Sequence, residues 1–317
     1  MAKRLQNRIA EGGLTLPVVI VTGIIVWLFI GLTTKSLWPQ LACFIVSVYL
    51  LIELSNANVL LRVRSRMVSA TFIMLSCTVP DLLGSLTGSI VQLCFICSLL
   101  MLFTTYQDNQ AAGRTFYAFA LLGIASMLWV YTLMFIPLLW VLMATQLQSL
   151  SWRTLAAALI GMVAPYWIAL LYLIYVQDLS FIATHFQPLG QWTNDTSYAS
   201  LTIGQTAAHV FLTVLTITGI IHFWRNSFKD KIRTRQIYGL LTAMALFTLL
   251  WIAIQPQHYT VLMRTAVVFS SPLIAHYLTL THTRWTNISF IVIVVTAILL
   301  TAYNLLSPLL PWPTHFQ

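Results

Sequence analysis

The fold is read most clearly from Trp224-Arg-Asn-Ser-Phe-Lys-Asp-Lys-Ile-Arg-Thr-Arg-Gln236, in which five of thirteen residues are basic. Apolar runs without a charged residue flank this segment at 206–223 and 237–254. A membrane-spanning helix needs about 20 mainly apolar residues, and a short connection rich in Lys and Arg stays on the cytoplasmic side of the membrane. Residues 224–236 therefore predict a basic cytoplasmic loop between two spans.

The same charge pattern extends along the whole chain. With about eleven spans, 14 of the 16 Lys and Arg fall in connections that face one side, and only Lys35 and Arg264 fall on the other. The longest polar segment, 177–205, has no Lys or Arg and carries Asp178 and Asp195, so it is expected to be the longest periplasmic loop, with an interfacial helix near 179–186. The pattern predicts a cytoplasmic N-terminus and a periplasmic C-terminus. The expected spans are 16–32, 37–54, 67–79, 85–103, 116–130, 133–145, 155–176, 206–223, 237–254, 261–280 and 288–306.

Composition supports a membrane protein and excludes two other classes. Of the 317 residues, 59% are hydrophobic and 7% are charged, and the mean hydropathy is +0.86; a soluble domain has about 25% charged residues. The net charge of +9 lies mostly in short loops, where it sets topology and contacts anionic lipid headgroups rather than nucleic acid. We expect an all-α polytopic transmembrane helical bundle in the bacterial inner membrane, with residues 1–317 forming a single integral membrane domain. No cofactor and no metal site are expected, because Cys94 and Cys97 have no second ligand pair nearby.

The number of spans in residues 115–147 decides on which side of the membrane every later connection lies. These 33 residues carry no charge, which is long for one upright span and short for two. Two short helices at 116–130 and 133–145, with a break between Trp129 and Leu133, keep the basic loop in the cytoplasm. One long kinked helix would place that loop outside. The charge pattern therefore favours the pair of helices.

Three charged residues near the outer side are candidates for function, because ionisable groups at a membrane are costly and seldom incidental. Arg264 begins a span on the side depleted of basic residues, and its planar guanidinium suits a lipid phosphate. The structural alternative is an Arg that reaches the headgroups or pairs with Asp81. Lys35, in the first outer turn, is a second candidate for lipid-phosphate binding. Asp81 follows Pro80 and is a candidate outer-side base or the partner of Arg264.

Other polar residues are expected to have no catalytic role. Glu53 lies at the cytoplasmic end of its span and is expected to pair with Arg62 or Arg64. The seven histidines do not group at one depth, as a di-iron centre would require, with His222 at the inner face and His276 within a span. No catalytic residue is predicted.

One part of the chain resembles a known membrane core. Within 58–172, a Gly-containing span, a short Pro-containing span and a Gly/Pro span follow one another: Phe116-Tyr-Ala-Phe-Ala-Leu-Leu-Gly-Ile-Ala-Ser126, Phe135-Ile-Pro-Leu-Leu-Trp140 and Gly161-Met-Val-Ala-Pro165. This order resembles the membrane core of GT-C type glycosyltransferases, which use polyprenyl-phosphate-linked sugars. The resemblance implies a GT-C-like fold and a lipid-linked substrate. Those enzymes carry an acidic catalytic residue in a large first outer loop, and here that loop is Thr33-Thr-Lys-Ser36, so the resemblance assigns no catalytic residue.

The whole chain is also similar to an uncharacterised polytopic inner-membrane protein family of Gram-negative bacteria. The likeness is carried by Ser151-Trp-Arg153, Asp230-Lys-Ile-Arg-Thr-Arg235, Gln255-Pro-Gln-His258, Ser270-Ser-Pro-Leu-Ile-Ala-His276 and Thr281-His-Thr-Arg284. The sequence thus favours a protein that handles a polyprenyl-phosphate-linked intermediate in cell-envelope assembly, with membrane lipids as partners. The alternatives are a non-catalytic membrane scaffold or subunit, and a transporter.

Overall fold

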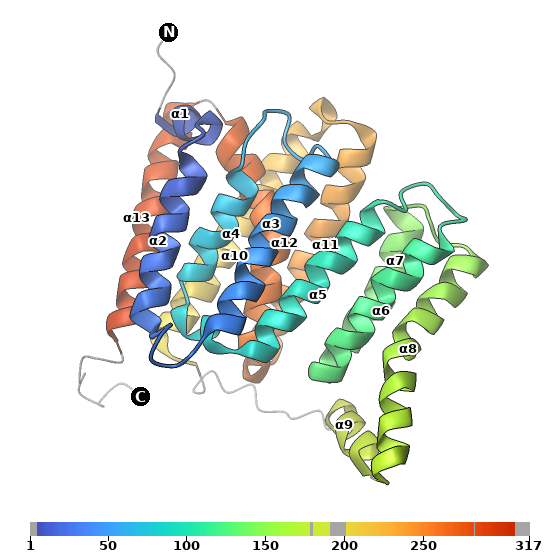
Figure 1. The fold of residues 1–317 in the computed structure, drawn as a ribbon. Helices are drawn as coiled ribbons and strands as arrows, with labels where there is room; N and C mark the ends of the chain where they lie inside the picture. The colour runs from blue at the N-terminus through green and yellow to red at the C-terminus, as the bar shows by residue number, and fades with distance from the viewer. Residues whose placement is uncertain (1–4, 178–179, 191–200, 282, 308–317) are drawn as a thin grey trace. The chain divides into compact units, whose positions relative to one another are not determined.

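A computed structural model describes residues 5–177, 180–190, 201–281 and 283–307 of the chain. Every regular element in these residues is a helix (Figure 1). Seven of the helices are long and apolar enough to cross a membrane. The prediction of an all-α, multi-pass membrane protein is confirmed at this level.

Each of the eleven segments expected to span a membrane contains a helix. These helices are α2 (Thr15–Ile30), α3 (Trp38–Ala57), α4 (Met67–Cys77), α5 (Leu86–Phe103), α6 (Ala112–Leu128), α7 (Phe135–Thr145), α8 (Trp152–Val176), α10 (Ile203–Asn226), α11 (Ile232–Ile254), α12 (Tyr259–Leu280) and α13 (Arg284–Leu306). The short elements are α1 (Leu5–Glu11), α9 (Ser180–Gly190), and the 3-10 turns η1 (Pro80–Gly84), η2 (Val130–Met134), η4 (Ser227–Lys229) and η5 (Pro256–His258). Because α2, α4, α6 and α7 are short, the count of eleven spans stays a prediction.

The break in the uncharged segment 115–147 is confirmed. Helix α6 ends at Leu128, and Trp129 has an extended backbone with φ −146° and ψ 98°. The turn η2 follows, and α7 then begins at Phe135. Pro137 fits the first turn of α7, where a missing backbone N–H breaks no helical hydrogen bond.

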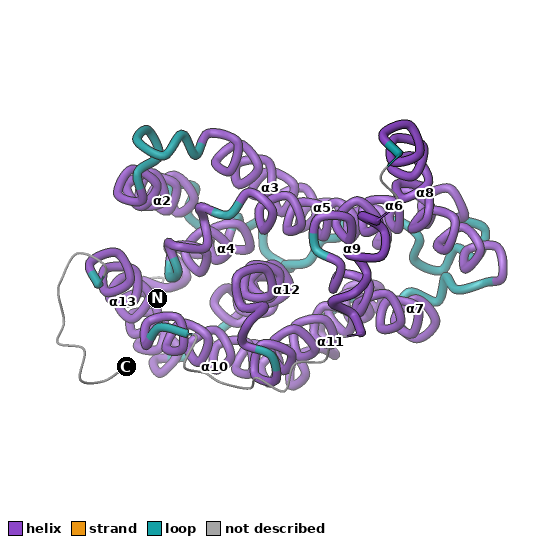
Figure 2. Tube along the Cα trace, turned by 90° about the horizontal axis from the view of Figure 1, so that it is seen from below, coloured by secondary structure: helices purple, strands orange, loops and turns teal. Residues whose placement is uncertain are grey.

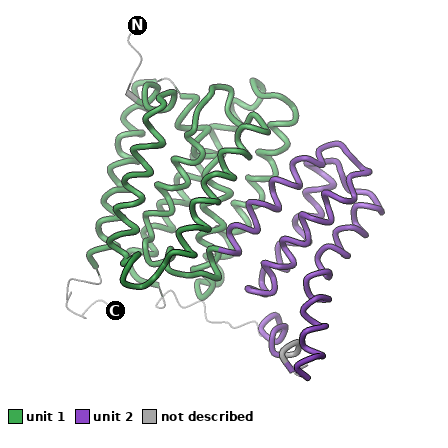
Figure 3. The backbone as a smooth tube through the Cα atoms, in the orientation of Figure 1, with its two compact units in different colours: residues 1–89, 196–317 green, residues 90–195 purple. Residues whose placement is uncertain are grey.

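The contacts divide the chain into two compact units (Figure 3). Unit 1 comprises Met1–Ser89 and Thr196–Gln317, and unit 2 comprises Ile90–Asp195. Whether they form the single membrane domain expected over residues 1–317 stays a prediction.

The two loops named from the sequence are shorter than expected. In the segment 177–205, residues 180–190 form α9, which confirms a helix near its expected position, while Asp178 and Asp195 lie outside the described residues. In the segment 224–236, α10 continues to Asn226 and α11 begins at Ile232. The periplasmic and cytoplasmic placements of these segments stay predictions.

Helix α12 forms the core of unit 1. It packs against α4, α10 and α11, which surround it in the view along the helices (Figure 2). In the most apolar stretch of 18 residues of each helix, 94% is buried for α12 and 22% for α13. Helix α12 is therefore the interior helix of this unit. Pro272 lies inside α12 and has no N–H to donate to Val268, whose carbonyl oxygen instead accepts from Ser271 Oγ at 3.2 Å.

Connections expected on the same side meet at the same end of unit 1. At one end, Arg62 contacts Asp230, Arg233 donates to Asn58 at 3.0 Å, and Gln6 donates to Thr281 at 2.7 Å. The opposite end gathers the other connections: Gln40 to Gly84 at 3.1 Å, Asn304 to Thr78 at 2.7 Å and Tyr259 to Gln205 at 2.9 Å. The alternation of the sequence pattern is therefore reproduced in the arrangement of unit 1.

In unit 2 the closest packing is between α6 and α8. A Cβ at Gly161 would lie 2.4 Å from the Phe116 carbonyl oxygen, and one at Gly123 would lie 2.6 Å from that of Met162. Only glycine permits such an approach, as in small-residue contacts between membrane helices. The Gly/Pro placement singled out in the sequence thus builds a helix pair.

Candidate functional site

Arg264 lies in the interior of unit 1, in the second turn of α12, with 5% of its surface exposed. Its Nε donates to the Leu82 carbonyl oxygen at 3.0 Å, Nη2 donates to the same oxygen, and Nη1 donates to Ser89 Oγ at 2.9 Å. Gly88 leaves room for the side chain, because a Cβ there would lie 3.0 Å from Arg264 Cδ. Arg264 therefore joins α12 to η1 and to the first turn of α5.

The two other candidate residues, Asp81 and Lys35, are exposed. Asp81 lies in η1 next to Leu82, but within the described residues Arg264 bonds to neutral acceptors and forms no ion pair with Asp81. Lys35 lies in the turn between α2 and α3. Lipid-phosphate binding by Arg264 and Lys35, and a role of Asp81 as a base, stay predictions.

A second polar site in unit 1 was missed by sequence reasoning. Asp230 accepts from Arg62 Nε at 2.6 Å and from Arg62 Nη2 at 2.9 Å, and its Oδ2 lies 3.4 Å from His276 Nε2. His276 Nδ1 in turn lies 3.3 Å from His222 Nδ1. His276 is fully buried, whereas His222 is partly exposed. The expectation that the histidines do not group is wrong for this pair, which the packing of α10 on α12 brings together.

The charges of Asp230 and Arg62 match each other in this site. Burial alone would raise the pKa of the Asp230 carboxyl, but the hydrogen bonds from Arg62 and His276 and the charge of Arg62 outweigh burial and lower that pKa. The hydrogen bond to Asp230 likewise raises the pKa of Arg62. Both side chains are therefore ionised at neutral pH, as a guanidinium–carboxylate pair.

The pairing of Arg62 also corrects an expectation. Glu53 is exposed and forms no ion pair with any described residue, including Arg62 and Arg64. The partner is Asp230, the one carboxylate in the basic segment 224–236. A single acidic residue among the basic residues of two connections that are expected on the same side was the signal in the sequence for this ion pair.

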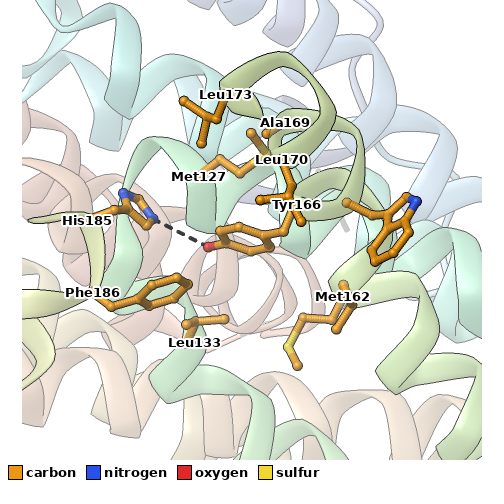
Figure 4. Close-up of a pocket in the computed structure, with 11 residues that line it drawn as sticks. Met127, Leu133, Met162, Tyr166, Ala169, Leu170, Leu173, His185 and Phe186 are labelled. Atoms are coloured by element: carbon orange, nitrogen blue, oxygen red, sulfur yellow. Dashed lines mark hydrogen bonds between the residues drawn. The ribbon is translucent and has the colours of Figure 1, made fainter. Parts of the chain in front are cut away.

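Unit 2 contains an apolar cavity of about 370 Å³ between α6, η2, α8 and α9 (Figure 4). Its walls are almost entirely hydrocarbon, aromatic and thioether side chains. The lining residues are Met127, Leu133, Met162, Val163, Tyr166, Trp167, Ala169, Leu170, Leu173, His185 and Phe186. Such a cavity suits an apolar chain.

One polar group of side chains lies at this cavity. Tyr166 Oη is 2.8 Å from Ser126 Oγ and 3.4 Å from His185 Nε2, toward which the phenol points in Figure 4. Ser126 Oγ donates to the Gly123 carbonyl oxygen at 2.7 Å, and His185 Nε2 lies 3.1 Å from the Ser126 carbonyl oxygen. Because both carbonyls can only accept, Ser126 donates its proton to Gly123, Tyr166 donates to Ser126, and His185 carries its proton on Nε2.

No family model, curated protein or solved structure matches this chain.

The network in unit 2 is arranged for binding rather than for nucleophilic attack. The Ser126 hydroxyl proton is directed at a helix carbonyl, and an activated serine would instead donate to a base. The Tyr166 oxygen, which donates its proton to Ser126 and can still accept, supplies a polar contact at one part of an apolar wall. The arrangement can hold a molecule that combines a long apolar chain with a polar group.

Proposed function

We propose that this protein is a bacterial inner-membrane protein of about eleven spans, with its N-terminus in the cytoplasm and its C-terminus in the periplasm. It binds a lipid-linked intermediate of cell-envelope assembly, of the polyprenyl-phosphate class. The binding site is the cavity of unit 2, and no catalytic step is assigned to it.

The observation that carries this proposal is the composition of the cavity wall. The polar groups of a water-soluble substrate would lose their hydrogen bonds among Leu133, Met162 and Leu170. An isoprenoid chain has no hydrogen bonds to lose there. The Tyr166 oxygen adds a polar group that can orient one end of the ligand in this cavity. The resemblance of residues 116–126 and 161–165 to GT-C cores supports the same ligand class.

Two neighbouring positions on α8 give a matched test. Leu170 lines the cavity, and Leu171 does not line it and has an exposed side chain. Leu170→Trp should reduce the polyprenyl phosphate retained after gentle extraction at least fivefold, because the indole occupies the space of the chain. Leu171→Trp should retain as much as the wild type. Native mass spectrometry of the purified proteins measures both.

Equal retention by the two variants and the wild type would remove the cavity from the proposal. A similar loss of retained polyprenyl phosphate in both variants would mean that the cavity is not the specific binding site, and would also contradict the proposal. Thermal unfolding of each variant checks that the helix pair is intact.

A further inference from the structure

A second pocket lies in unit 1, where α10 and α12 end beside the basic connection. It has a volume of about 420 Å³ and is lined by Thr218, Ile221, His222, Arg225, Asn226 and Tyr277. Besides an imidazole and a phenol, its wall includes a cationic side chain and an amide, which the cavity of unit 2 lacks. Its composition suits a small charged group.

The hydrogen-bonded chain behind this pocket fixes where the protons of His222 lie. Asp230 is held as an acceptor by Arg62, so His276 must donate to it from Nε2. The Nδ1 of neutral His276 is then an acceptor, and His222 must donate to it from its own Nδ1. The Nε2 of His222 is the remaining nitrogen, on the ring of a residue that lines the pocket.

The charges around the pocket favour an anion. The titratable groups that face or neighbour His222 are His276 and Tyr277 of α12, Arg225 of α10, Lys229 of η4, and the Arg62–Asp230 pair. The Asp230 charge is already matched by Arg62, whereas Arg225 forms no ion pair with a described residue. An entering anion would therefore find a guanidinium whose charge is not compensated nearby.

We infer that this pocket binds the phosphate group of a phosphate monoester, with Arg225 as its cation and with a proton taken up on Nε2 of His222. An ionised phosphate oxygen only accepts hydrogen bonds, so His222 must carry protons on both nitrogens to donate to it and to His276 at once. Asp230 and Arg62 are positioning residues that orient His276 and, through it, His222. This site is independent of the lipid cavity in unit 2.

The test uses sulfate as a probe, because sulfate keeps its double charge while the protein titrates. Calorimetric binding of sulfate to the full chain in detergent should weaken as pH rises, by up to about tenfold per pH unit for one linked proton. Titrations in buffers of different ionisation enthalpy should show net proton uptake by the wild type. Absence of sulfate binding, or binding without proton uptake, would overturn the inference.

Three variants separate the site from general attraction to basic residues. Arg225→Gln should lower sulfate affinity at least tenfold. His222→Asn keeps a donor near the Nδ1 position and loses Nε2, so it should abolish the pH dependence. Arg235→Gln removes the same charge from an exposed position outside the pocket and should change affinity less than twofold. Equal losses for Arg225→Gln and Arg235→Gln would contradict a defined site, provided that thermal unfolding shows both variants folded.

The source of the phosphate is identified by competition. In nanodiscs of phosphatidylcholine, sulfate should bind as it does in detergent. If added phosphatidic acid displaces sulfate, the ligand is a lipid headgroup; if only a soluble phosphate monoester such as glycerol phosphate displaces it, the ligand is soluble. Displacement by neither contradicts the inference.

Discussion

Arg264 is a buried cation whose described partners are all neutral. A guanidinium in the interior is costly unless its N–H groups are satisfied, and here a carbonyl oxygen and a hydroxyl accept from it. A Cβ at position 88 would crowd this side chain, at 3.0 Å from Arg264 Cδ and 3.2 Å from Nε. Gly88 and Arg264 are thus expected to depend on each other energetically.

Gly88→Ala tests this dependence. In the wild type the added methyl would press on Arg264 Cδ and Nε, at 3.0 and 3.2 Å, and should lower the free energy of unfolding by about 1 kcal/mol. In an Arg264→Ala background the space is vacated, and the same change should be neutral or stabilise by up to about 1 kcal/mol, since alanine favours the helix over glycine. Chemical denaturation of the four proteins in mixed micelles measures the coupling; additive effects would disprove it.

Asp230 should make stability depend on pH. Its folded-state pKa is lowered, so its contribution is fully present above the ordinary carboxyl value near 4 and is lost as pH falls through the folded value. Acidification from neutral pH should therefore destabilise the wild type. Asp230→Asn should be less stable at neutral pH, by about 1–3 kcal/mol, and should lose part of the acid sensitivity. Thermal unfolding at several pH values tests this, and parallel curves for the two proteins would contradict it.

Among the elements, the pair α6–α8 depends on contacts between backbones. A methyl at position 161 would lie 2.4 Å from the Phe116 carbonyl oxygen, and neither helix can relieve this by rotating a side chain. Gly161→Ala should therefore push the helices apart and cost about 1–3 kcal/mol. Gly113→Ala is the control, because nothing lies within 4 Å of its added methyl, and it should leave stability unchanged or raise it by up to about 1 kcal/mol. Equal effects of the two changes in denaturation would refute this account of the packing.

The sequence predicted the elements better than the sites. The helices and the break at Trp129 follow from apolar length and from the charges on either side, which are local properties of the chain. The pairing of His222 with His276 spans 54 residues, and that of Arg62 with Asp230 spans 168. Such contacts depend on how one helix is rotated and shifted along another, and hydropathy carries no information on that register. The cavity of unit 2 was missed for the same reason, although its walls include segments noted in the sequence.

For the whole molecule, the orientation in the membrane is the property to measure first. The 14-to-2 division of basic residues predicts that position 190 is periplasmic and position 229 cytoplasmic. In a cysteine-free background, Gly190→Cys should react with an impermeant thiol reagent in intact cells. Lys229→Cys should react only after permeabilisation. Labelling of position 229 from outside would contradict the predicted topology and indicate the opposite orientation.

The enclosed position of α12 has a consequence for how the protein is made. Of the seven long helices it is the least apolar, and it carries Arg264 and His276. An Arg costs about 2.5–3.5 kcal/mol at the centre of a lone helix in lipid, and less near an end, where Arg264 lies in α12. During synthesis, however, α4, α10 and α11 leave the ribosome before α12 does. The translocon thus releases α12 into a membrane where its protein surroundings already exist, and the last part of the core is inserted against helices rather than against lipid.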